Sequence, residues 1–114
     1  MEKVKKYQKI VEKVLEERLR FPTSYNPHLK DILVIDKEKK HFMVITFGWD
    51  NQEEYVNSPI FHIEVTKSGK VLIRDNNTDV QIDEILIANK IADKDILDGM
   101  EAIYPKTLAD SKAA

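Results

Sequence analysis

The sequence contains no cysteine and only three glycines in 114 residues. The absence of thiols excludes disulfides, cysteine nucleophiles and cysteine zinc sites, and nothing marks an oxidising compartment. The glycines form neither a phosphate-binding loop nor a G-x-S-x-G nucleophile turn, and no H-E-x-x-H helix occurs. With these reactive motifs missing, we predict a protein that is not an enzyme and that needs no cofactor and no metal.

Long apolar runs and an excess charge of one sign are also missing. No apolar run approaches the roughly 20 residues of a membrane span, and the first six residues, MEKVKK, are charged where a signal peptide is apolar. Eighteen basic and twenty acidic residues leave a net charge of −2, which creates no overall attraction to nucleic acid or to anionic membranes. We therefore expect a cytoplasmic protein with no membrane contact.

The most informative stretch that is present runs from His41 to Trp49, where six of nine residues are large and apolar. Side chains alternate between the two faces of a strand, so both faces of this segment would be apolar. Such a strand is typical of the middle of a sheet. On this basis Trp49 is predicted to be buried, beside Ile45 and Phe47.

The remaining elements are predicted to cover this strand within one domain, residues 1–114. Residues 2–20 have the apolar spacing of an amphipathic helix, and strands are expected at 29–36, 58–66 and 71–74. Thr78 and Gln81 have the spacing of a capping box that would begin a second helix, ending near residue 89 or 90. The predicted fold class is α+β: an antiparallel sheet of four strands, or five if residues 96–97 extend its edge, packed by both helices. Residues 105–114 are expected to form a poorly ordered tail.

Candidate functional residues are few. His62 and Glu64 share the polar face of a predicted strand, but two ligands make no metal site, and alternation of polar residues explains them without one. Trp49 and Tyr55, with Tyr25, have the chemistry of a base-stacking surface, although such aromatics are more often core or protein interface. We take Trp49, Tyr55, His62 and Glu64 as the candidate protein interface.

A basic patch on the first helix is the weaker candidate for nucleic-acid contact. It comprises Lys5, Lys6, Lys9 and Lys13, and Lys3 lies nearby. Glutamates are interleaved with these lysines and reduce their local field, so a solvated helix face is the favoured interpretation. We expect weak, salt-sensitive or absent binding to duplex DNA.

The sheet itself predicts self-association. Four strands and two helices leave one face or edge of the sheet partly unprotected, and an exposed edge pairs readily with another strand. We expect a homodimer. The competing expectation is that the chain from Ile96 onward covers this edge and leaves a monomer.

Several short strings, in order, resemble the XisI family of fdxN element excision controlling factors, found in heterocyst-forming cyanobacteria. The resemblance covers nearly the entire chain and depends on the order and spacing of the strings rather than on any one of them. The strings are YQKI at 7–10, SY at 24–25, GW at 48–49, FHIEV at 61–65, KVLI at 70–73, TD at 78–79 and ADKDI at 92–96.

The resemblance implies an accessory factor for site-specific excision of a DNA element, a form of site-specific recombination. It also implies a partner, XisH, and a recombinase through which the factor acts on DNA. Two main functions then remain open: a protein-interaction module that controls a DNA-acting partner, and a direct DNA-binding factor. A small-molecule pocket between the sheet and the helices is a third, weaker hypothesis. The net charge favours the interaction module.

Overall fold

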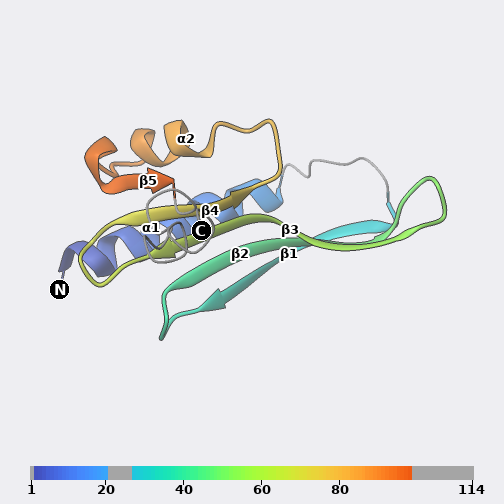
Figure 1. The fold of residues 1–114 in the computed structure, drawn as a ribbon, viewed down its shortest axis with the longest axis horizontal. Coiled ribbons are helices and arrows are strands. Elements are labelled where there is room, and N and C mark those ends of the chain that lie inside the picture. The colour runs from blue at the N-terminus through green and yellow to red at the C-terminus, as the bar shows by residue number, and fades with distance from the viewer. Residues whose placement is uncertain (1, 21–26, 99–114) are drawn as a thin grey trace, which may run out of the picture.

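Five strands form one sheet in which neighbouring strands follow the order of the chain, β1-β2-β3-β4-β5 (Figure 1). The computed structural model describes residues 2–20 and 27–98. Its elements are α1 (Glu2–Leu19), β1 (Leu29–Asp36), β2 (His41–Trp49), β3 (Tyr55–Val65), β4 (Val71–Asn76), α2 (Ile82–Ala88), a 3-10 turn η1 (Asp93–Asp95) and β5 (Ile96–Asp98). The α+β fold class is confirmed, with five strands. The predicted tail, the loop residue Tyr25 and Met100 lie outside the described residues.

The first half of the chain follows the predicted pattern closely. The helix α1 ends one residue before the predicted limit, and β1 and β2 have the predicted bounds. A tight turn joins these two strands as an antiparallel hairpin, since the carboxylate of Asp36 accepts hydrogen bonds from the backbone N–H groups of Glu38 and Lys39. Local side-chain chemistry therefore fixes the register of β1 on β2.

Three boundaries differ from the prediction by two residues or more. The strand β4 continues to Asn76, whereas the prediction ended it at Arg74. The strand β3 begins at Tyr55 rather than at residue 58, because Asp50 closes a short turn by accepting hydrogen bonds from the N–H groups of Gln52 and Glu54. The predicted capping box was wrong: Thr78 Oγ1 accepts the N–H of Val80, and α2 begins only at Ile82 without a side-chain cap.

The last strand, β5, differs in direction from the rest. It pairs with β4 in parallel, whereas the other three pairings are antiparallel. A parallel return needs a crossover, and α2 with η1 supplies it. The strand β5 thus covers the β4 edge of the sheet, and among the described strands β1 is the other edge. Whether the protein is a monomer or a dimer stays a prediction.

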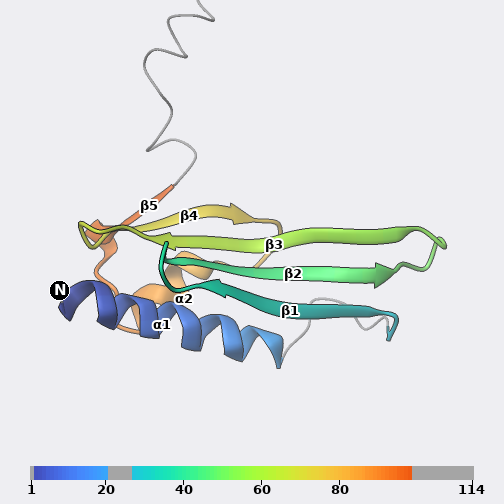
Figure 2. The same cartoon turned by 90° about the horizontal axis from the view of Figure 1, so that it is seen from below.

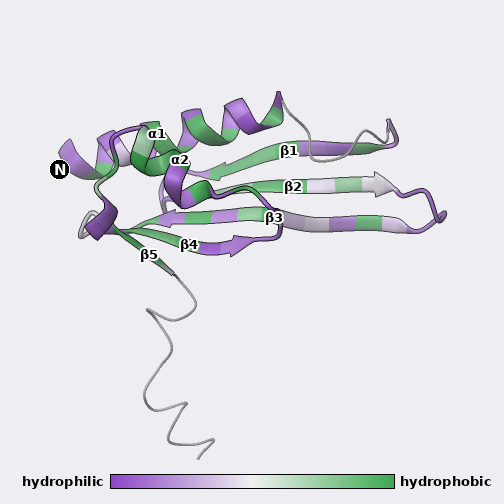
Figure 3. Cartoon of the chain, turned by 90° about the horizontal axis from the view of Figure 1, so that it is seen from above, coloured by the Kyte–Doolittle hydropathy of each residue, from purple (hydrophilic) through white to green (hydrophobic). Residues whose placement is uncertain are grey.

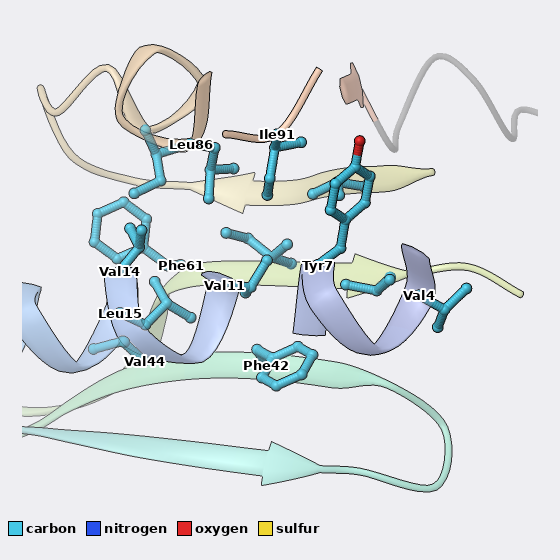
Figure 4. Packing of buried hydrophobic residues seen from close by; sticks show 14 residues of the cluster. Val4, Tyr7, Val11, Val14, Leu15, Phe42, Val44, Phe61, Leu86 and Ile91 are labelled. Atoms are coloured by element: carbon cyan, nitrogen blue, oxygen red, sulfur yellow. The ribbon is translucent and has the colours of Figure 1, made fainter. Parts of the chain in front are cut away.

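Both helices lie on the same side of the sheet (Figures 2 and 3). Figure 3 shows the hydrophobic stripe of α1 turned toward the strands, and the buried core lies in between. In Figure 4, Val11 and Leu15 of α1 meet Phe42 and Val44 of β2 and Phe61 of β3. These residues are buried, so hydrophobic burial accounts for the attachment of α1 to the sheet.

None of the described helices covers the opposite face of β2 (Figure 2). Phe42, Val44 and Thr46 are buried, but the alternate residues Met43, Ile45 and Phe47 are only partly buried, and Trp49 is 56% exposed. The prediction that Trp49 is buried was therefore wrong. The physical reason is that both described helices pack on one face, and β2 and β3 continue beyond the end of α1 (Figure 2).

A buried carboxylate joins the beginning of the chain to the last described segment. Asp95 is 1% exposed and accepts a 2.6 Å hydrogen bond from Tyr7 Oη. Lys3 Nζ lies 2.9 Å and Lys70 Nζ 3.1 Å from its two oxygens, and Tyr7 Oη accepts the N–H of Ala92. Hydrogen bonds from Tyr7 and Lys3 hold the pKa of Asp95 well below its ordinary value. The cluster clamps α1, the β3–β4 hairpin and η1 together.

The Asp95 cluster predicts acid-sensitive stability. Replacing Asp95 by Asn removes the charge that three donors share and should lower the free energy of unfolding at pH 7 by about 1–3 kcal/mol. Because the folded pKa lies below the unfolded value of about 3.9, the charge stabilises fully above that value. Its contribution falls as the pH drops toward the folded pKa. Urea unfolding should therefore show a gap between wild type and Asp95→Asn that narrows from about pH 5 to about pH 2; a constant gap contradicts this role.

The two faces of β2 predict different costs of truncation. Trp49→Ala removes a largely exposed side chain and one aromatic contact, so the expected loss of stability is about 1 kcal/mol. Phe42→Ala, on the buried face of the same strand, is the matched control and should cost about 3–5 kcal/mol. Chemical denaturation of both variants measures the difference. Equal losses would mean that Trp49 belongs to the core.

Candidate interaction surface on the open sheet face

The face of β1, β2 and β3 turned away from the helices is rich in apolar side chains, and we call it the open face. In an antiparallel pair, residues directly opposite each other share a face, which assigns its members from the register. Ile32 lies opposite Ile45, Val34 opposite Met43, and Trp49 opposite Tyr55. The apolar members of the open face are Ile32, Val34, Met43, Ile45, Phe47, Trp49, Tyr55 and Pro59.

Trp49 and Tyr55 form an aromatic pair at the far end of this face. Their ring centroids are 5.5 Å apart and the ring planes meet at 67°, the edge-to-face geometry that aromatic rings favour. Tyr55 is 57% exposed, similar to Trp49. Two large, exposed aromatic side chains in contact are the residue types that dominate binding energy at protein interfaces.

Gly48 sets the position of Trp49. Its φ is +134°, and a Cβ atom at this residue would overlap the carbonyl oxygen of His28. This close approach allows the N–H of Trp49 to donate a 3.1 Å hydrogen bond to the same oxygen. Only glycine fits this backbone, so the residue before Trp49 must be glycine for the strand to keep this shape.

A polar cluster occupies the other end of the open face, about eight residues or 27 Å away along β2. His41 Nδ1 lies 2.9 Å from His62 Nε2, and His41 Nε2 lies 3.9 Å from Glu64. Arg74 binds Glu64 Oε1 through Nη2 at 2.6 Å and Nε at 2.7 Å. The pKa of His62 is lowered mainly because the ring is partly buried. The charges of His41 and Arg74 lower it further. At this contact one ring nitrogen must donate and the other accept, so at least one of the two imidazoles is neutral.

The side chains of this cluster are engaged mainly with one another. Arg74 already engages the carboxylate of Glu64, and each histidine nitrogen at the contact is used by the other ring. Within residues 2–20 and 27–98, no group of three or more His, Cys, Asp or Glu side chains is placed to hold a metal ion. The cluster thus forms a polar border beside the apolar members of the open face, as at many protein interfaces.

The structure places all four candidate interface residues on one face but not in one cluster. Trp49 and Tyr55 lie at one end, and His62 and Glu64 lie at the other. Sequence reasoning missed the apolar residues between them and on the neighbouring strand, where Ile32 is 43% and Val34 41% exposed. The run of four apolar residues in β1 was the available signal. The contributions of His41 and Arg74 depend on strand register, which the sequence spacing does not reveal.

The basic residues of α1 are separated from the open face, because α1 packs on the other side of the sheet (Figure 2). Lys5, Lys6, Lys9 and Lys13 are all exposed. The first three line a shallow groove together with Lys90, which follows α2; Glu2, Ile10 and Asn89 complete its walls. Lys3 instead pairs with Asp95. The structure therefore gathers three of the four predicted lysines and adds Lys90.

The family model of the XisI protein matches residues 1–111. A solved XisI-like protein from Anabaena variabilis ATCC 29413 superposes with a TM-score of 0.76 at 25% identity, over 85% of this chain and 86% of that chain. The fdxN element excision controlling factor XisI from the same organism gives a TM-score of 0.70 at 20% identity, over 93% and 97%.

No curated protein matches the sequence. Of the helices described, none is both long and apolar enough to cross a membrane. The family match spans nearly the entire chain, and both solved structures share its fold over most of their length. The chain belongs to the XisI family.

Proposed function

We propose that this protein is an accessory factor controlling site-specific excision of a DNA element, and that it acts as a non-enzymatic module by binding another protein. The observation that carries the proposal is the open face, an apolar surface that neither described helix covers, with an aromatic pair at one end and a polar cluster at the other. Family membership supports the biological setting, as does the likeness to a solved fdxN element excision controlling factor. Such a factor would work in the cytoplasm, beside the DNA.

A partner of the XisH type fits this proposal, because the family resemblance implies one. The open face suits a protein better than a nucleic acid, since its largest exposed members are apolar or aromatic. Its charged groups are of both signs: Glu64 pairs with Arg74, and Lys30 and Asp36 lie at the two ends of β1. Large apolar patches on a protein surface commonly mark protein interfaces. DNA would then be reached indirectly, through the partner and a recombinase.

The test is binding of an XisH-like protein encoded in the same genome. The double variant Trp49→Ala/Tyr55→Ala should weaken the complex about thirtyfold or more, because even one aromatic hot-spot residue commonly contributes about 2 kcal/mol. Ile87→Ala is the matched control: Ile87 is also a large exposed apolar residue but lies on α2, on the helix side. Isothermal titration calorimetry compares the three proteins. Unchanged affinity of the double variant, or a loss confined to Ile87→Ala, contradicts the proposal.

Direct DNA binding is the second candidate, and the groove of Lys5, Lys6, Lys9 and Lys90 is the observation that favours it. Phosphate contacts from these lysines would give an affinity that falls steeply with salt. A fluorescence titration with duplex DNA separates the candidates: Lys5→Glu/Lys9→Glu would abolish binding by this groove. Weak binding at physiological salt that the double variant leaves unchanged supports the interaction module instead.

A further inference from the structure

We propose that two copies of this protein pair through their β1 strands, antiparallel about a two-fold axis beside Leu33, to form one continuous sheet of ten strands. The proposal concerns the edge of the sheet, not the open face, and it goes beyond the proposed function. It can be tested on the protein alone, so its failure would leave the partner-binding proposal untouched.

The first observation is that β1 is a long and regular edge. It pairs with β2 over eight consecutive residues without a register shift, and among the described residues no strand pairs with its outer side. Natural edges are usually protected by proline, bulges or short length. β1 has no proline and no bulge, whereas the opposite edge, β5, has only three residues. Unpaired N–H and C=O groups of β1 can therefore accept another strand.

The second observation is charge complementarity within β1 itself. On the open face the strand reads Lys30, Ile32, Val34 and Asp36, a cation and an anion at opposite ends of an apolar pair. Antiparallel pairing with Leu33 opposite Leu33 places Lys30 of each copy opposite Asp36 of the other. It also places Ile32 opposite Val34. Opposite charges and apolar pairs directly across strands both stabilise a sheet.

Shifted registers lose this match. Moving the axis to Ile32 sets Lys30 opposite Val34, and moving it to Val34 sets Ile32 opposite Asp36. Either shift leaves a charge facing an apolar side chain. A register change of a single residue would set side chains of the open face across from side chains of the helix face. The pairing centred on Leu33 is thus the register in which both terminal charges are neutralised.

The helix side of β1 tolerates the same pairing. Leu33 would lie opposite Leu33 of the other copy. In each copy this side chain is partly buried and packs against the core. Asp31 would lie opposite Ile35, but its carboxylate already accepts a 2.5 Å hydrogen bond from Thr46 Oγ1 within its own protomer. The pairing therefore leaves no carboxylate newly without a hydrogen bond, and it joins the two open faces into one surface.

Charge reversal with mixing tests this register. In a homodimer, Lys30→Glu sets a carboxylate opposite Asp36 at both ends of the contact, and Asp36→Lys sets an ammonium group opposite Lys30 at both ends. Each variant should therefore dimerise about tenfold or more weakly than wild type, because like charges directly across strands repel. In a mixed dimer of the two variants, one end pairs two reversed residues and the other end pairs two native ones, and both ends join opposite charges.

Two measurements read the outcome. Sedimentation should show wild type near twice the 13.3 kDa of one chain. Native mass spectrometry of an equal mixture of the two variants should show heterodimers well above the roughly twofold excess over either homodimer that random pairing gives.

Lys39→Glu is the control, since it makes the same change of charge as Lys30→Glu in the turn beyond the paired residues. It should dimerise like wild type. Asp36 also accepts two turn hydrogen bonds, so circular dichroism must show that Asp36→Lys is folded. If that variant does not fold, the contrast between Lys30→Glu and Lys39→Glu decides. Wild type that stays at one chain mass at every concentration, or equal effects of Lys30→Glu and Lys39→Glu, overturns the proposal.

Discussion

The structure depends on an imbalance between apolar sheet surface and the helices that cover it. β2 carries large apolar side chains on both faces, yet α1 and α2 pack on the same face. Burial of Phe42, Val44 and Phe61 under α1 supplies the core, at roughly 25 cal/mol for each Å² of apolar surface removed from water. The same strands leave Met43, Ile45 and Phe47 in contact with solvent on the other side. The open face is a direct consequence of this one-sided cover.

The Asp95 cluster makes the one-sided arrangement rigid. A helix on a sheet face is held by side-chain packing that resists separation, but hydrogen bonds and ion pairs of fixed geometry also determine its position. Tyr7 and Lys3 of α1 meet Lys70 of the β3–β4 hairpin at a single buried carboxylate. Because Asp95 directly precedes β5, the same contact positions the parallel strand that protects the far edge. Among the described strands, β1 is left as the exposed edge.

The sequence predicted the elements of this fold better than their surroundings. Period-three-and-four spacing in α1 and apolar runs in β1 and β2 are local signals, and these elements have almost the predicted bounds. Thr78 misled because its hydroxyl can serve a turn as well as a helix, and here it bonds the N–H of Val80. Burial of Trp49 was inferred from apolar neighbours on its own strand. The inference failed because cover for a strand comes from other elements, whose placement no local pattern encodes.

The same distinction explains the candidate site. Sequence alone singled out Trp49, Tyr55, His62 and Glu64 as interface residues by chemistry, and the structure places all four on the open face. The pairing of His41 with His62 and of Arg74 with Glu64 arises from cross-strand register. That register shifts once where β2 pairs with β3 and once where β3 pairs with β4. Such shifts have no reliable sequence signal, so the polar cluster could not be assembled from spacing.

Trp49 offers the most direct measurement of the central claim, that the open face is the surface through which this protein binds its partner. It is the only tryptophan in the chain, so labelling this protein with 5-fluorotryptophan gives one fluorine resonance at the open face. In the protein alone, that resonance should shift on exchange of water for deuterium oxide, as an exposed indole does. In the complex with an XisH-like partner the account predicts that the solvent shift is lost. A solvent shift that persists unchanged in a fully formed complex would contradict the account.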